Sequence, residues 1–276
     1  MENPPAILIP YSYAYDAPSL REATHRIGFL GRVLAAFRIE RLILYRDREG
    51  GVYRRNALLV KELLDYLCTA PYLRKRLYSL RPSLRYAGLL PPLNIPTHPE
   101  VDDIRVEGIH YRQALVVSSG DTSLLDAGLR REVRLGRRLG RGSRVVLRVE
   151  VGGGGRRFKL VPSSSLEVYD GFRTSLAEGL EEALRGYDVR IATSRYGEDA
   201  AAALPSLRDL AKSGRVCIAF GAYDRGLEEI VGGSGRRLEE LFTKVLNTVP
   251  GQGVRTVRTE EALAYTLAIW NLHLRS

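Results

Sequence analysis

A loop near the C-terminal end, residues 247–261, combines residue types that could bind a small molecule. It reads NTVPGQGVRTVRTEE, and its proline and two glycines let the backbone bend sharply and come close to a ligand. Arg255 and Arg258 add positive charge to the same loop. These features predict either a small-molecule site or a surface turn, and the loop alone does not decide between them.

Three short apolar runs must position this loop. They predict strands at residues 188–192, 216–220 and 244–246. The runs lead into polar or glycine-rich turns at Ser194, Gly221 and Asn247. Because ligands bind at the carboxyl ends of the strands in open parallel sheets, we expect these three turns to converge.

Helical periodicity fills most of the chain around these strands. The expected helices span residues 19–37, 57–69, 72–80, 174–184, 205–212, 226–231 and 236–242, with a final helix from Thr259. Two further strands, at residues 6–9 and 41–45, flank the first helix and complete a β-α-β unit. The alternation predicts an α/β domain with a parallel sheet.

The helix ends carry their own signals. Ser19 and Glu22 have the form of a capping box, and Thr259 before Glu260 and Glu261 is a second expected N-cap. The last helix also places an apolar face outward, which could pair with another subunit and consists of Leu263, Leu267, Trp270 and Leu274. Residues 80–98 hold four prolines, so we expect an irregular but packed segment there.

The pattern changes between about residues 99 and 165, where short strands and glycine turns replace helices. The expected strands are residues 104–108, 110–117, 132–135, 143–151 and 157–161. Five short strands in this length predict a small inserted barrel of the OB-fold type. The chain would then divide into residues 1–98, the inserted barrel at 99–165, and residues 166–276.

Charge is concentrated in this insertion. The chain carries a net charge of +10, and residues 127–159 contain ten arginines and one lysine against Glu132 and Glu150. A basic barrel face with few acids favours binding to the RNA backbone over a generally arginine-rich surface.

Composition excludes several other classes. The two cysteines, Cys68 and Cys217, lie in apolar runs and predict buried thiols in a reducing compartment. No long apolar run or leader is recognised, so we expect a cytoplasmic protein without a membrane span. No metal-ligand constellation is present in the sequence. The excess of arginine over lysine fits either a thermophilic source or a coding bias.

The C-terminal residues resemble the cofactor-binding end of the SPOUT superfamily of RNA methyltransferases. The resemblance rests on Gly221 followed by residues 247–262, in the pattern Asn-x-x-Pro-x-Gln-Gly-x-Arg-x-x-Arg-x-Glu-Glu-Ala. Residues 84–92 (LRYAGLLPP) and 258–262 are similar to the archaeal and eukaryotic family of RNA (uridine-N3) methyltransferases. The first helix keeps the superfamily spacing at Gly28, Arg32 and Phe37, but Arg26 and Arg38 replace its asparagine and glycine.

This resemblance implies an α/β fold with a C-terminal trefoil knot, an inserted OB-like module and a homodimer formed through the first and last helices. It also implies S-adenosylmethionine as cofactor. The expected cofactor-binding residues are Thr193, Ser194, Phe220, Gly221, Gly226, Leu246, Asn247, Thr248, Val249, Pro250, Gln252, Gly253, Val254 and Thr259.

The chemistry and the RNA contacts need separate residues. Arg32 and Arg258 are the expected catalytic residues, because either could stabilise a uridinate anion. His98 is the best candidate base among the histidines. The expected RNA-binding residues are Arg21, Arg85, Arg130, Arg131, Arg134, Arg137, Arg138 and Arg141.

Two other functions remain as rivals at this stage. A non-catalytic RNA-binding factor of ribosome assembly would use the same basic barrel but would not bind S-adenosylmethionine. A Rossmann-type nucleotide-binding enzyme would need Gly-x-Gly-x-x-Gly after the first strand, and residues 10–19 contain no glycine.

Overall fold

The chain forms two compact units in a computed structural model, which describes residues 4–99, 106–233 and 235–274. The first unit comprises residues 1–65, 86–91 and 172–276, and the second comprises residues 66–85 and 92–171. The first unit holds a parallel sheet and the second an antiparallel one, so the predicted α/β class with a separate antiparallel barrel-like sheet is confirmed. The domain boundaries at residues 99 and 165 stay predictions, because compactness alone does not define an independently folding unit.

A six-stranded parallel sheet forms the centre of the first unit. Its strands, in spatial order, are β11 (Lys244–Asn247), β9 (Val189–Asp199), β10 (Val216–Ala219), β1 (Ala6–Pro10), β2 (Arg41–Tyr45) and β8 (Arg173–Ala177). The inner strands β1 and β10 are buried along their whole length, which explains their continuous apolar sequences. All five strands predicted for this part of the chain are therefore confirmed.

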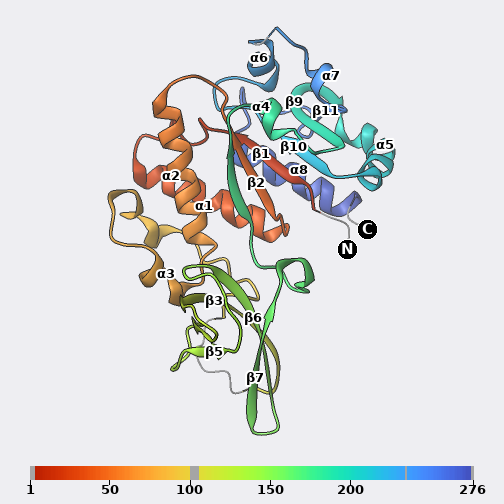
Figure 1. Cartoon of the computed structure of the whole chain (residues 1–276). Coiled ribbons are helices and arrows are strands. Elements are labelled where there is room, and N and C mark those ends of the chain that lie inside the picture. Colours follow the sequence, from red (N-terminus) through yellow and green to blue (C-terminus); the bar gives the residue numbers. More distant parts are fainter. Residues whose placement is uncertain (1–3, 100–105, 234, 275–276) are drawn as a thin grey trace. The chain divides into compact units, whose positions relative to one another are not determined.

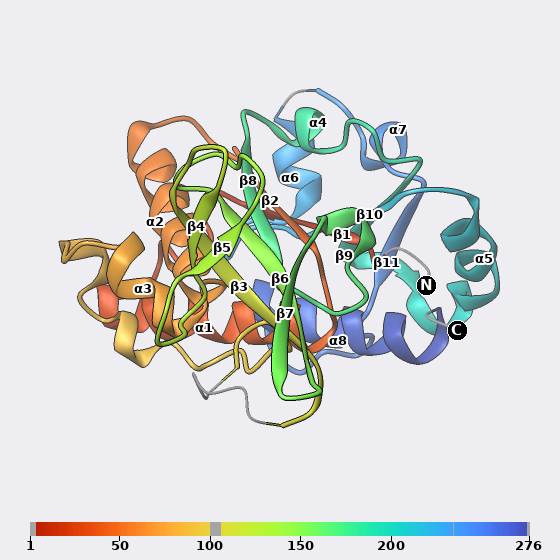
Figure 2. The ribbon, with the colours of Figure 1, turned by 60° about the horizontal axis from the view of Figure 1, so that its bottom comes forward.

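Helices cover both faces of this sheet, as Figures 1 and 2 show. On one face lie α4 (Leu180–Ala183), α6 (Leu227–Gly232) and α7 (Leu238–Leu241), and they pack against Ala6 and Leu8 of β1. On the other face α1 (Leu20–Ala36) packs against α8 (Thr259–His273). Helix α5 (Ala200–Ser213) contacts β9 and β11 at the sheet edge, and α2 (Gly51–Leu67) follows β2.

The buried face of α1 is mostly apolar, as helical periodicity predicts. Ser19 accepts a hydrogen bond from the Glu22 amide at 3.2 Å, as expected of an N-cap. The outward apolar face predicted for the last helix is wrong. Its four residues are all buried within the first unit, at 8% exposure or less for Leu263, Leu267, Trp270 and Leu274.

The second unit is built around a five-stranded antiparallel sheet. Its strands, in spatial order, are β5 (Val133–Leu135), β4 (Ser123–Asp126), β3 (Gly108–Ser118), β6 (Arg144–Gly152) and β7 (Gly155–Val161). Strands β6 and β7 form a long hairpin that turns at glycines 152–155 (Figure 1). Ahead of the sheet in the chain come α3 (Pro71–Leu77) and the short 3-10 helix η1 (Pro82–Leu84), and η3 (Ser163–Ser165) follows it. The 3-10 helix η2 (Ala87–Leu89) belongs to the first unit.

Two sequence-based elements are wrong. Residues 174–184 form the edge strand β8 and then the short helix α4, although their apolar residues recur at helical spacing. Thr174 and Ala177 of β8 are buried and the whole strand pairs with β2, so this pairing outweighs the weak helical signal. The strand expected at 104–108 lies partly outside the described residues; 106 and 107 form a bend, and the strand that the pattern missed is β4.

A buried arginine fastens α3 to this antiparallel sheet. Arg112 is 1% exposed and donates from Nε to the Ala127 carbonyl at 2.7 Å, while its guanidinium lies 4.9 Å from the ring centroid of Tyr72. The Tyr72 hydroxyl donates to the Gln113 carbonyl at 2.7 Å. Gly128 lets the ring in, because its φ is +66° and a Cβ there would lie 2.3 Å from Tyr72.

A buried carboxylate organises the carboxyl edge of the parallel sheet. Asp47, just after β2, has a fully buried side chain that accepts from the amide and hydroxyl of Ser12 at 3.1 and 2.8 Å. It also pairs with Arg48 at 2.8 Å and with Arg225 at 3.5 Å. Arg48 in turn pairs with Asp224 at 2.6 Å and holds the pKa of that carboxyl below its ordinary value. Asp47 therefore ties together the loops that follow β1, β2 and β10.

Replacing Gly128 by Ala should destabilise the second unit by about 2–4 kcal/mol, because the new methyl group meets a ring that is held on two sides and the backbone needs a positive φ. Urea unfolding of the full chain, followed by the fluorescence of its tyrosines, measures this change. Gly136→Ala is the matched control in the same sheet region, since a Cβ there meets nothing within 4 Å. Equal midpoints for the two variants would contradict the packing described.

Asp47→Asn should lower the free energy of unfolding by about 3–5 kcal/mol, because it leaves two arginines beside a neutral amide in a buried setting. Asp224→Asn removes a carboxylate from the same arginine, Arg48, but its side chain is 41% exposed, so the loss should stay below about 1 kcal/mol. Denaturant titrations of both variants at pH 7 compare the two effects. If Asp224→Asn lowered the free energy of unfolding more than Asp47→Asn, Asp47 would not be the residue that holds these loops together.

Candidate functional site

The three turns predicted to converge do meet at the carboxyl edge of the sheet. Thr193, after the regular part of β9, donates its hydroxyl proton to the Ala219 carbonyl of β10 at 3.0 Å. Asn247, at the end of β11, donates from its side-chain amide to the Arg195 carbonyl at 3.0 Å. Thr259 donates its hydroxyl proton to the Gly221 carbonyl at 3.2 Å. Convergence is therefore confirmed, through hydrogen bonds that link all three turns.

The loop after β11 has an open, turn-rich backbone. The Asn247 side chain accepts from the Val249 amide at 3.0 Å, which starts the loop with a tight turn. Gly251 has a φ of +70°, and a Cβ at Gly251 or Gly253 would meet nothing within 4 Å. Gln252 donates to the Val254 carbonyl at 2.9 Å. The loop is thus stabilised by its own side chains and leaves bare backbone on its surface.

The end of β9 is the second wall of this region. Ala192 lies opposite Val245, but the next paired residue of β9 is Glu198 opposite Leu246, so residues 193–197 bulge out of the sheet. A Cβ at Gly197 would lie 2.6 Å from the Leu246 backbone, which only glycine permits. The Ser194 hydroxyl donates to Glu228 at the start of α6. The bulge therefore brings Thr193 and Ser194 beside the β11 and α6 turns.

The third turn joins β10 to α6. Phe220 is buried, and its carbonyl accepts from the Tyr45 hydroxyl at 2.6 Å, which anchors the turn to β2. A Cβ at Gly221 would lie 3.1 Å from the Arg225 carbonyl, so the turn is closed upon itself. Gly226 is the N-cap residue of α6. Tyr223, Asp224 and Arg225 form a bend between Gly221 and Gly226.

The start of α8 differs from the expectation. Arg258 and not Thr259 is the N-cap residue, and Glu261 accepts from the Arg258 amide at 2.9 Å. Thr259 is buried, and its hydroxyl serves Gly221 instead of the helix end. The sequence therefore predicted the N-cap one residue too late. The Thr259 hydroxyl bonds to Gly221, which is far away in the chain, and does not cap the helix. The Arg258 side chain itself is exposed at the mouth of the loop.

An ion pair that the sequence did not predict links α1 to α8. Arg26 donates from Nε to Glu260 at 3.0 Å and from Nη1 to Asp16 at 2.7 Å, and burial raises the pKa of the neighbouring Tyr13 well above its ordinary value. Glu260 is 5% exposed. Arg26 and Glu260 lie 234 residues apart in the sequence. The only hint in the sequence was the arginine at position 26.

Arg32 lies exposed on α1, one turn beyond Gly28. Gly28 itself is buried, and a Cβ there would lie 2.8 Å from Pro91 and 3.2 Å from Leu90. The proline-rich segment of this same chain is therefore what approaches α1 so closely. Arg32 and Arg258 both belong to the first unit, and neither is buried.

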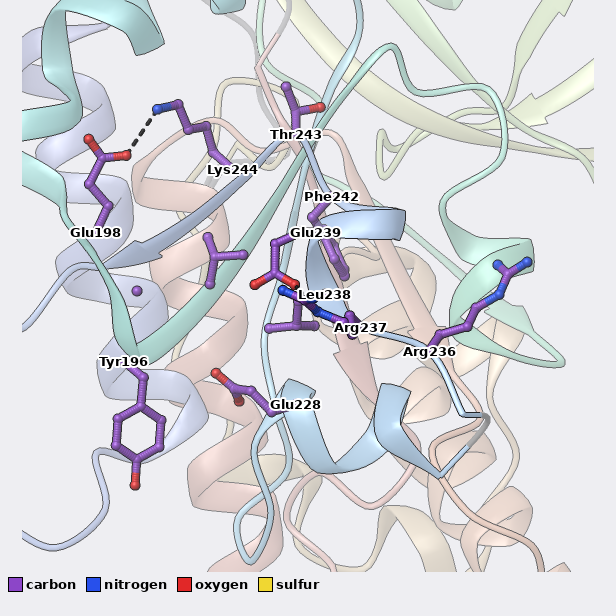
Figure 3. Close-up of a pocket in the computed structure, with 12 residues that line it drawn as sticks. Tyr196, Glu198, Glu228, Arg236, Arg237, Leu238, Glu239, Phe242, Thr243 and Lys244 are labelled. Carbon is purple, nitrogen blue, oxygen red and sulfur yellow. Dashed lines mark hydrogen bonds and ion pairs between the residues drawn. The ribbon is translucent and has the colours of Figure 1, made fainter.

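A pocket of about 600 Å³ lies next to these turns (Figure 3). Its walls come from the β9 bulge, α6, α7 and the start of β11, and include Tyr196, Glu228 and Phe242. None of the predicted cofactor-binding residues lines it, although Ser194 reaches its wall through Glu228. Its cations are paired, since Lys244 contacts Glu198 at 2.9 Å and Arg237 contacts Glu239 at 3.3 Å.

The predicted RNA-binding arginines are all exposed. Arg21 lies on α1 in the first unit, and the others belong to the second unit: Arg85, Arg130, Arg131, Arg134, Arg137, Arg138 and Arg141. Those between residues 130 and 141 surround β5 and the turns that flank it. His98 lies in the second unit as well, where burial lowers its pKa to about 4, so it is a weak proton acceptor.

Two kinds of feature are absent from the described residues. Residues 4–99, 106–233 and 235–274 contain no group of three or more potential metal ligands. Over the same ranges no helix is long and apolar enough to cross a membrane.

Comparison with known proteins adds the evidence of descent. Residues 5–270 match the family model described as "Putative RNA methyltransferase". An uncharacterized protein of Halobacterium salinarum is 35% identical over 95% of this chain and 96% of its own length. The 28S rRNA (uridine-N(3))-methyltransferase of Homo sapiens is 30% identical over 95% of this chain and 76% of its own. The protein of the same name from Mus musculus is 30% identical over 95% and 74%.

The match extends over nearly the whole chain, including both units and all three converging turns. It favours an enzyme over a non-catalytic assembly factor. The chain therefore belongs to this family of RNA methyltransferases.

Proposed function

We propose that this enzyme transfers a methyl group from S-adenosylmethionine to N3 of a uridine in large-subunit ribosomal RNA. The observation that carries the proposal is the convergence of three strand-end turns within a chain that is similar throughout to named rRNA (uridine-N3) methyltransferases. Membership of the family supplies the reaction type, and the names of the relatives supply the substrate.

The converging turns fit the proposed methyl donor. An adenosine with a charged methionine tail needs hydrogen-bonding backbone and little side-chain bulk, and Gly251 and Gly253 leave the loop backbone bare. We assign its binding to the residues predicted from the sequence, namely Thr193, Ser194, Phe220, Gly221, Gly226, Leu246, Asn247, Thr248, Val249, Pro250, Gln252, Gly253, Val254 and Thr259. The hydrogen bonds of Thr193, Asn247 and Thr259 hold these turns in place for it.

Methyl transfer to N3 of uracil requires loss of the N3 proton. The bound donor supplies a methyl group that is already activated by its sulfonium charge, so the protein chiefly has to position the base. Arg32 and Arg258 can favour the uridinate anion electrostatically, because both are exposed cations and Arg258 begins the helix that follows the cofactor loop. The proton leaves to solvent, or to the RNA itself.

RNA binding is assigned to the exposed arginines. Arg130, Arg131, Arg134, Arg137, Arg138 and Arg141 form no ion pair within the described part of the chain, so their charge is available for phosphates. Arg21 and Arg85 are the further candidates outside this stretch.

The finer features of the family resemblance are proposals as well. We propose a SPOUT-type fold with a C-terminal trefoil knot, which is supported by the position of β11 beside β9 and by the return of α8 to α1. The antiparallel sheet is proposed to be OB-like. A homodimer through α1 and α8 is supported by the exposed side chains of Phe29, Tyr265 and Leu272. The two free cysteines suit a reducing cytoplasm.

Asn247→Ala should weaken S-adenosylmethionine binding about 10- to 100-fold, because it removes two hydrogen bonds that shape the cofactor loop. Isothermal titration calorimetry of the RNA-free protein measures the affinity for S-adenosylmethionine. Asn56→Ala is the control, since the Asn56 side chain on α2 also makes two hydrogen bonds to the backbone, in its case by donating to two carbonyls. If the unchanged protein binds no S-adenosylmethionine, the proposed donor is wrong.

Arg32→Ala and Arg258→Ala should each lower kcat about 10²- to 10³-fold while S-adenosylmethionine still binds, because they remove charge opposite a developing anion. The measurement is transfer of labelled methyl groups to ribosomal RNA, followed by mapping of the modified nucleoside. Arg185→Ala, an exposed arginine outside the converging turns, is the control. Unchanged kcat in either variant removes that residue from the chemistry, and a product other than N3-methyluridine overturns the proposed position.

A further inference from the structure

Two arginines of the second unit meet beside a pair of tyrosines at the end of α2. Arg74 donates from Nε to the Thr69 carbonyl at 3.0 Å, and Arg144 of β6 donates from Nη1 to the Thr69 hydroxyl at 2.7 Å. The Arg74 guanidinium lies 4.7 Å from the ring centroid of Tyr66. Tyr66 and Tyr78 form an edge-to-face pair at 5.1 Å. We call these five residues the Thr69 cluster.

The cluster carries positive charge without a counter-charge. Arg74 donates to the Thr69 carbonyl and to the Leu67 carbonyl (3.3 Å), and no ion pair joins Arg74 or Arg144 to a carboxylate within the described residues. Arg76 on the same helix shows the ordinary alternative, since it pairs with Asp126 and Glu132, each at 3.4 Å. Burial lowers the pKa of Arg74.

The neighbouring histidine does not compensate this charge either. His98 is buried, and its pKa is lowered first by that burial and then by the fields of Arg74 and Arg144, although a hydrogen bond to the Cys68 carbonyl opposes the shift. It is therefore neutral at physiological pH, and the two arginines set the local potential.

A purely structural role explains the position of Arg74 but not the rest of the cluster. The last carbonyls of α2 attract one cation, and Arg74 serves as that cation. The carbonyls of α2 do not explain why Arg144 of β6 bonds to the same threonine, nor why two half-exposed tyrosine rings lie beside it. Guanidinium groups next to aromatic rings are the combination that holds a nucleotide, with the phosphate on the arginines and the base on a ring.

We propose that the Thr69 cluster binds one unpaired nucleotide of the RNA substrate, with its phosphate between Arg74 and Arg144 and its base against Tyr78 or Tyr66. The proposal rests on RNA being the substrate and adds a site to the exposed arginines around β5. An unpaired nucleotide is required because a base within an RNA helix offers no free face to a tyrosine ring. A duplex would reach the arginines alone.

The test is fluorescence anisotropy with a labelled ten-nucleotide oligouridine and with a blunt RNA duplex of ten base pairs, at several salt concentrations. Arg144→Gln should weaken oligouridine binding about 10-fold and reduce the salt slope by about one. Tyr78→Leu should weaken oligouridine binding about 10-fold and leave duplex binding unchanged. Tyr78→Phe should bind oligouridine as the unchanged protein does, because the ring alone stacks on the base. Arg144 is exposed, so its variant should still fold, and circular dichroism checks this.

Arg76→Gln is the matched control, because this exposed arginine on α3 is already paired with carboxylates. It should change oligouridine binding less than 2-fold. Equal losses for Arg76→Gln and Arg144→Gln would overturn the proposal in favour of a diffuse surface charge, and so would equal effects of Tyr78→Leu on oligouridine and duplex. An unchanged protein that binds neither RNA would refute the RNA substrate itself, which is a different result from loss of discrimination between variants.

Discussion

The carboxyl edge of the parallel sheet depends on one buried charge, the carboxylate of Asp47. A buried carboxylate is tolerated only when donors and cations satisfy it, and Ser12, Arg48 and Arg225 do so from three separate loops. The last of these loops also carries Gly221, whose carbonyl accepts from Thr259 at the start of α8. The shape of the candidate site therefore follows from an ion network that lies beside it and contributes no group to the proposed chemistry.

The site itself is made mostly of backbone. Its side chains bond to neighbouring carbonyls, as Thr193 does to Ala219, and its glycines leave the loop surface bare. That composition suits methyl transfer, because an activated methyl group needs alignment more than it needs acids and bases. The charged residues proposed for RNA binding and catalysis lie instead on α1, at the start of α8 and in the second unit.

Local patterns made much of the fold predictable. Buried parallel strands are short apolar runs, so all five strands predicted for the first unit were confirmed, and their shared direction was enough to predict that the turns at Ser194, Gly221 and Asn247 meet. Two of the misses involve partners distant in the chain. Residues 173–177 became a strand because β2 offered an edge, and Thr259 left its capping role because Gly221 lies within reach.

Residue types and spacing thus determined most of the element order, the basic character of the insertion and the loop that the candidate site is built around. The family resemblance was carried by two short segments of that same sequence, and the match over residues 5–270 bears it out. Tertiary structure alone decided that Arg26 would pair with Glu260 and that Leu90 and Pro91 would fill the space over Gly28. It also brought Arg74 and Arg144 together at Thr69. The physical reason is that periodicity records which face of an element is buried, whereas a pairwise contact depends on where two remote elements pack.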